Sequence, residues 1–185
     1  ISLWSQYLFG SSIIKQKMQS QVRTEISIQL KKVCDYLGPD TPLRIDSHEH
    51  FHMIPFVFEV LLSVRAKFNI EYIRMPREPF FYDSSPTSIK NYLSLNLFKH
   101  ILLNILSIWH SRDLSNKGIR YTNYFIGLLF TGTMPITAVK KALAVIKSKK
   151  THTSSIVDIL FHPGKAYQEE FNLWKTPLNK IIIFL

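Results

Sequence analysis

The sequence predicts an α/β fold built on short, parallel, buried strands. Short apolar runs alternate with helical patterns along the chain, and this alternation is typical of parallel sheets covered by helices. Polar clusters follow the ends of the apolar runs, as expected where parallel strands deliver side chains to a site. With 185 residues and 46% hydrophobic content, the chain has enough material for one core. We therefore expect residues 1–185 to form a single domain.

The first predicted helix covers residues 21–37, which Gly38 and Pro39 end. Its apolar residues recur at steps of three and four, at Val22, Ile26, Leu30, Val33 and Leu37. Cys34 is the only cysteine, which excludes an internal disulfide and a cysteine-based zinc finger. Its place on the apolar side of the helix predicts a buried thiol.

Two strands are predicted on either side of a second helix. Leu43–Ile45 is a short apolar strand, and Pro55 suits the first turn of a helix that continues over residues 56–68. Residues 70–75 read as the next strand, which Pro76 ends.

The second half of the chain continues the same alternation. Its predicted elements are a loop at 77–87, a long helix at 88–109, a turn at 116–118, a helix at 135–149 and a buried strand at 155–161. Residues 121–132 show no clear periodicity. The helix at 88–109 is rich in Leu and Ile but carries Lys90, Lys99 and His100, which favours a buried or membrane-facing helix over a spanning one.

The chain is basic, with 23 Lys and Arg against 13 Asp and Glu and a formal net charge of +10. Such a balance can favour nucleic acid, anionic lipid or an acidic substrate. The densest basic group lies at 140–150, near the end of one predicted helix, and has no interleaved aromatic residues for stacking bases. We interpret it as a solvated helix face and predict no nucleic-acid partner. With one cysteine and no visible signal peptide, we expect a cytoplasmic protein.

The most informative segment is Asp46-Ser47-His48-Glu49-His50-Phe51-His52, directly after the first predicted strand. Imidazole and carboxylate are the usual ligands of divalent ions and also serve as general acids and bases. If the strand continues past Ile45, the alternate residues share one face; otherwise they fan out as the chain turns into a loop. The pattern favours a metal site over a set of surface or hydrogen-bonded histidines.

A second polar cluster follows the last predicted strand, where His162 precedes Pro163-Gly164. Because the carboxyl ends of parallel strands converge, His162 and His48 are expected to share one pocket, although His162 taken alone could equally be a turn residue. Arg74 and Glu78 flank the end of the strand at 70–75, where a structural salt bridge is slightly favoured over substrate contact. Asp158, inside the last strand, is expected to pair with a base or with backbone.

These motifs together resemble those of a known family. Residues 45–55 are similar to the D-S-H-x-H-x-H-x-x-P signature of the YdjC-like carbohydrate deacetylases, which include chito-oligosaccharide deacetylase and the hopanoid-biosynthesis-associated deacetylases. Glu25 and Gln29, residues 73–79, 127–132 and 158–164 also follow the family's order. The resemblance covers most of residues 20–175.

The resemblance implies a distorted (β/α) barrel and a metal-dependent hydrolase that removes acetyl groups from N-acetylated sugars. By the family pattern His48 is a ligand of a divalent ion, Mg or Zn, and His162 is a catalytic acid or orienting group. The residues expected to bind substrate or support the site are Asp46, His50, His52, Arg74 and Glu78. In such sites the ion polarises the acetyl carbonyl and lowers the pKa of bound water.

The family also has an Asp-Asp motif and a Gly-x-His segment upstream, and nothing in this chain matches them. We therefore interpret the chain as the C-terminal two-thirds of such an enzyme, with the first strands of the barrel missing. The expected partner is an N-acetylated sugar or oligosaccharide, and a lipid-linked sugar and a homodimer are compatible with the pattern. The alternative is a catalytically inactive remnant that acts at most as a binding module.

Overall fold

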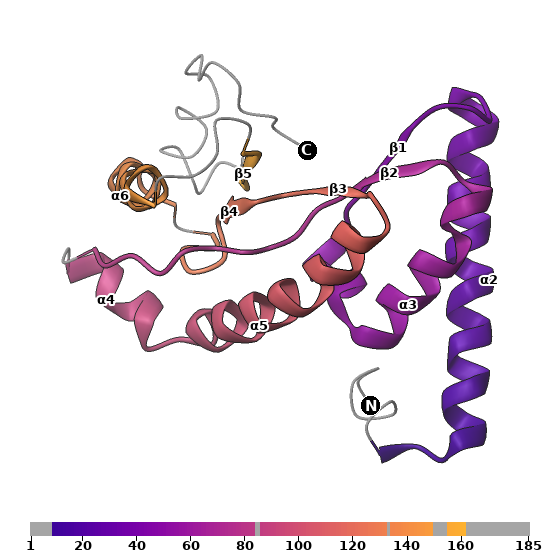
Figure 1. Cartoon of the computed structure of the whole chain (residues 1–185). Coiled ribbons are helices and arrows are strands. Elements are labelled where there is room, and N and C mark those ends of the chain that lie inside the picture. The colour runs from indigo at the N-terminus through magenta and orange to yellow at the C-terminus, as the bar shows by residue number, and fades with distance from the viewer. Residues whose placement is uncertain (1–8, 84–85, 133, 150–154, 162–185) are drawn as a thin grey trace. The chain divides into compact units, whose positions relative to one another are not determined.

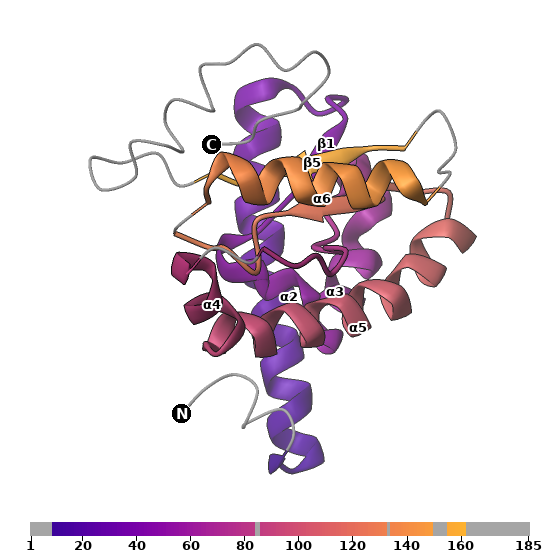
Figure 2. The same ribbon diagram turned by 90° about the vertical axis from the view of Figure 1, so that its left-hand side faces the viewer.

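The computed structural model describes residues 9–83, 86–132, 134–149 and 155–161 (Figures 1 and 2). The chain divides into two compact units, one of residues 1–74 and 112–120 and the other of residues 75–111 and 121–185. Each unit contains helices and parallel strands, so the predicted α/β class is confirmed. The described strands form one sheet of three strands and one of two.

The sheet of the first unit has the order β1-β2-β3. β1 (Leu43–Ile45) has the predicted bounds and runs parallel to β2 (Ile70–Ile73). The short β3 (Arg120–Tyr121) follows β2 in this order. Leu43 and Ile73 are buried, as their apolar character predicts.

Two helices accompany this sheet. α2 (Ser12–Leu37) begins earlier than predicted because Ser11 caps it, accepting a hydrogen bond from the N–H of Ile14 at 3.4 Å. α2 packs against α3 (Pro55–Val64), as Figure 1 shows, and the 3-10 turn η2 (Arg65–Lys67) continues α3 as far as Lys67. Cys34 is half-buried rather than fully buried.

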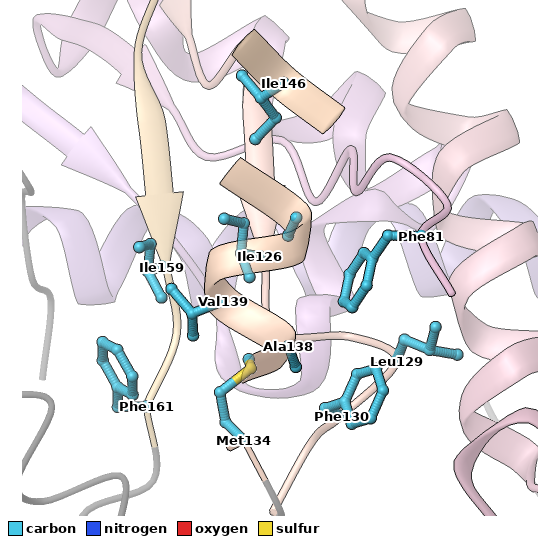
Figure 3. Close-up of a cluster of buried hydrophobic side chains, with 11 residues drawn as sticks. Phe81, Ile126, Leu129, Phe130, Met134, Ala138, Val139, Ile146, Ile159 and Phe161 are labelled. Carbon is cyan, nitrogen blue, oxygen red and sulfur yellow. The ribbon is translucent and has the colours of Figure 1, made fainter. Parts of the chain in front are cut away.

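The second unit is built around two parallel strands, β4 (Tyr124–Ile126) and β5 (Val157–Ile159), paired with Phe125 opposite Asp158. α6 (Ile136–Ser148) packs on β4, and its predicted ends, Pro135 and Lys149, are its caps. Figure 3 shows the apolar core between them. The buried members of this core are Phe81, Ile126, Leu129, Phe130, Met134, Ala138, Val139, Ala142, Ile146, Ile159 and Phe161.

The prediction of a single helix at 88–109 is wrong, because the structure has two helices there. α4 (Pro86–Tyr92) ends before Leu93, and α5 (Leu95–Asn116) begins after Ser94. The hydroxyl of Ser94 donates to the carbonyl of Asn91 at 2.7 Å and accepts from the N–H of Asn96 at 3.1 Å. One side chain therefore satisfies both helix ends and stabilises the break.

None of the described helices is long and apolar enough to cross a lipid bilayer. Three members of the basic group on α6, Lys140, Lys147 and Lys149, are exposed. Lys141 is half-buried and forms an ion pair with buried Asp83 at 2.6 Å. The predicted solvated face is thus confirmed for the three exposed lysines.

Candidate functional site

The segment after β1 turns sharply at the histidine motif. β1 ends at Ile45, and His48–Met53 forms the 3-10 element η1. Within it Glu49 and His50 have φ of 49° and 59°, the left-handed region that residues other than glycine rarely adopt. The sequence left two geometries open, one shared strand face or a fan of side chains from a loop, and the structure shows the second.

The buried side chain of His52 anchors this segment through hydrogen bonds. Its side chain is buried, with 3% exposure. Nε2 lies 2.7 Å from the carbonyl oxygen of Arg74, and Nδ1 lies 2.6 Å from Oγ of Ser47. The same Oγ accepts the backbone N–H of His52 at 2.9 Å. The ring thus connects Ser47, two residues after the end of β1, to Arg74, the residue that follows β2.

Arg74 anchors the same segment by three different groups. Its backbone N–H donates to the carbonyl of Ile45 at 2.9 Å, and its carbonyl accepts from His52. Its guanidinium is buried and forms an ion pair with Asp46, whose side chain is 38% exposed. Arg74 thus forms a salt bridge as expected, but its partner is Asp46. Glu78, which was named together with Arg74, accepts backbone N–H groups instead.

The remaining two histidines of the motif differ in exposure. His48 is exposed, whereas His50 is half-buried, and its ring centroid lies 6.2 Å from that of His52 in an edge-on arrangement. Asp46, His52 and Arg74 are engaged in holding the loop, so His48 is the predicted site residue that this loop presents to solvent.

We tested whether these residues fit the expected divalent ion. Across the described ranges, no three His, Cys, Asp or Glu side chains come close enough together to hold one metal ion. The nitrogens of His52 are both engaged, and the carboxylate of Asp46 faces a guanidinium. The described residues therefore do not form a metal centre by themselves, and His48 can supply at most one ligand to such a centre.

In the second unit, Glu78 lies in a different environment. Its carboxylate, 1% exposed, accepts the backbone N–H groups of Gly127, Leu128 and Leu129 at 2.6, 3.2 and 2.8 Å. Nε2 of buried His100 lies 3.7 Å from Oε2. Burial raises the pKa of Glu78 to about 7, although the three N–H groups act in the opposite direction. Burial also lowers the pKa of His100.

The loop that Glu78 holds packs tightly on the end of β5. Gly127 has φ of 139°, and a Cβ there would lie 2.9 Å from Cβ of Leu160. The N–H of Leu160 donates to the carbonyl of Ile126 at 2.9 Å. His162 lies outside the described residues, so its predicted role and its proximity to His48 stay predictions.

The sequence reasoning did not identify three polar residues of these networks, Thr122, His100 and Ser47. Asp158 is fully buried and accepts from the hydroxyl of Thr122 at 2.7 Å, whereas a base or a backbone group was predicted. Thr122 Oγ1 in turn accepts the N–H of Met75 at 3.1 Å. Thr122 lies in the stretch without periodicity, and His100 was taken only as a polar break in an apolar helix. Ser47 is part of the D-S-H-x-H-x-H segment, and this position was the only sign in the sequence that it could matter.

Comparison with known proteins places the chain in a family. The sequence profile of the family described as YdjC-like protein matches residues 3–179. The chain belongs to the YdjC-like family. The segment 46–52 and the buried residues Arg74 and Glu78 all lie inside this match.

Two curated relatives extend the comparison beyond the YdjC-like profile. A carbohydrate deacetylase of Danio rerio is 29% identical over 131 residues, which are 69% of this chain and 39% of that protein. A carbohydrate deacetylase of Xenopus laevis is 28% identical over 158 residues, 78% of this chain and 48% of that protein. The chain thus spans about half the length, or less, of the relatives it matches. No solved structure gives a significant match.

Proposed function

We propose that this chain carries part of a metal-dependent carbohydrate deacetylase that removes acetyl groups from N-acetylated sugars. The observation that carries the proposal is the D-S-H-x-H-x-H segment at the carboxyl end of the parallel strand β1. Ends of parallel strands are where α/β enzymes gather their catalytic groups. Membership in the YdjC-like family and two relatives named carbohydrate deacetylase support the same reaction. On this proposal the two open sheets belong to a distorted (β/α) barrel.

The proposal assigns different tasks to the residues of the segment. Exposed His48 is the ligand that this chain offers to a divalent ion, Mg or Zn, whose further ligands lie outside the described residues. Half-buried His50 lines the site beside it. Asp46 and Arg74 hold the loop through their ion pair. His162 remains the proposed acid or orienting group, and Glu78 supports the backbone of the second unit.

The decisive experiment measures acetate released from an N-acetylglucosamine oligosaccharide by the full-length protein that contains this chain, supplied with Mg²⁺ or Zn²⁺. We expect release that a chelator abolishes and the metal restores. His48→Ala is expected to lower the rate by about 100-fold or more, because the loss of even an outer partner of a ligand costs 10- to 100-fold. Glu59→Ala, an exposed acid on α3, is the control and is expected to leave the rate unchanged.

Two outcomes would contradict the proposal. Release that is equal in His48→Ala and the unchanged chain would remove His48 from the site. An absence of release from the unchanged full-length protein with either metal would favour the inactive remnant, which calorimetry with the oligosaccharide then tests as a binding module.

A further inference from the structure

The last histidine of the motif is placed for a task other than binding an ion. We propose that His52 is a positioning residue: its neutral ring, protonated on Nε2, holds the loop that presents His48. A carbonyl oxygen only accepts hydrogen bonds, so the 2.7 Å contact with Arg74 requires the proton on Nε2. In the neutral ring Nδ1 is then bare and accepts the hydroxyl of Ser47 at 2.6 Å.

The loop needs such a clamp because its backbone is strained. The left-handed region is unfavourable for residues other than glycine, and Glu49 and His50 are two such residues in succession. Strained conformations persist where surrounding contacts determine them. Ser47 provides these contacts: its carbonyl accepts the N–H of His50 at 3.1 Å and its Oγ accepts the N–H of His52 at 2.9 Å. The ring of His52 fixes Ser47 in turn.

Among the side chains, a neutral imidazole suits this task especially well. The position needs an acceptor toward Ser47 and a donor toward the carbonyl of Arg74, on two separate atoms of one rigid group. Imidazole offers both, and metal-binding sites commonly depend on outer groups that orient their ligands. His48 is therefore the ligand that the loop exposes, and His52 acts through it. The catalytic part of this inference rests on the proposed deacetylase function; the tautomer and the loop conformation do not.

The first test needs no variant. In the full chain labelled with ¹⁵N-histidine, long-range proton–nitrogen spectra at neutral pH report which ring nitrogen carries the proton. We expect His52 to be neutral, with Nε2 protonated and Nδ1 bare. A ring protonated on Nδ1 alone, or on both nitrogens, would overturn the inference.

The second test separates positioning from catalysis with His52→Leu, His52→Gln and Ser47→Ala. The readouts are the intraresidue amide-to-Hα Overhauser effects of Glu49 and His50, which are strong when φ is positive, and the kcat and KM of acetate release. We expect His52→Leu to weaken both effects and to lower kcat by about 10- to 100-fold with little change in KM. His52→Gln, which keeps a donor for Arg74, recovers part of both, and Ser47→Ala falls between them.

His48→Ala is the matched variant, because it should lower acetate release by about 100-fold or more and leave both Overhauser effects intact. His52→Leu or Ser47→Ala with unchanged effects and unchanged kcat would overturn the positioning role. If the unchanged full-length protein releases no acetate, the proposed function fails, while the tautomer and the Overhauser effects still decide the inference.

Discussion

The loop after β1 and the loop after β4 solve the same structural problem in different ways. Each follows a parallel strand, and in each one buried side chain holds the turning backbone. After β1 the ring of His52 connects a hydroxyl to a carbonyl, and His48 remains exposed beside it. After β4 the carboxylate of Glu78 gathers three N–H groups, and the residues that it holds, Gly127 to Leu129, are all buried.

The comparison of His48 with Glu78 shows that burial and hydrogen-bond partners together distinguish a residue available to a ligand from one that holds the fold, whereas residue type does not. Glu78 and His48 are equally suited to binding an ion or moving a proton, and both were predicted as site residues. Both carboxylate oxygens of Glu78 accept main-chain N–H groups at 1% exposure, so Glu78 stabilises the fold. His48 is available to a ligand, and the anchoring is left to His52 and Arg74.

The largest effect is expected from removing the carboxylate of Glu78. Glu78→Ala leaves three buried N–H groups without their acceptor, which we expect to lower the free energy of unfolding by about 3–5 kcal/mol. The control is Glu71→Ala, which breaks an exposed ion pair with Arg120 at 2.8 Å and should cost less than about 1 kcal/mol. Urea unfolding measures both. Equal small losses would show that Glu78 does not support the second unit.

The raised pKa of Glu78 predicts that the free energy of unfolding depends on pH. Because this pKa is about 7 when folded and 4.5 as a reference, the folded chain binds more protons between these pH values. The stability due to this proton is complete below pH 4.5 and is lost as the pH rises through 7. It amounts to at most about 3 kcal/mol.

Buried His100 has a lowered pKa, so its contribution to stability is lost as the pH falls, which is opposite to the effect of Glu78. The measurement therefore compares the unchanged chain with a Glu78 variant, because both contain His100. We expect the free energy of unfolding of the unchanged chain, relative to Glu78→Gln, to fall between pH 4.5 and 7. A constant or rising difference would contradict the assignment.

A smaller effect is expected from the glycine that Glu78 holds. In Gly127→Ala the new Cβ meets Leu160 at 2.9 Å on a backbone with φ of 139°. Gly118→Ala is the control, since its φ is 65° and nothing lies within 4 Å. Thermal unfolding should show Gly127→Ala to be less stable than Gly118→Ala by about 2 kcal/mol. Equal stabilities would mean that the loop after β4 can shift away from Leu160.

The sequence predicted the elements whose signals are local. β1 has its predicted bounds, and the limits of α6 follow from Pro135 and its apolar spacing. The break at Ser94 was missed because a capping serine inside an apolar run has no periodic signature. The left-handed Glu49 and His50 were missed because such conformations normally select glycine.

For the candidate site, the residue types were predictable but their tasks were not. The signature drew attention to His48 and His52 together, and only their neighbours separate them. The partners of His52 are Ser47 and a carbonyl that lies 22 residues away in sequence. The partners of Glu78 are backbone groups about 50 residues away, which no side-chain pattern encodes.

The most direct test of the account is a Zn²⁺ titration of the full chain followed through its histidine ring nitrogens. The account predicts that the ring signals of His48 shift or broaden, whereas those of His52 keep the positions of a neutral ring protonated on Nε2. A titration in which His52 responds as strongly as His48, or in which His48 does not respond, would contradict it.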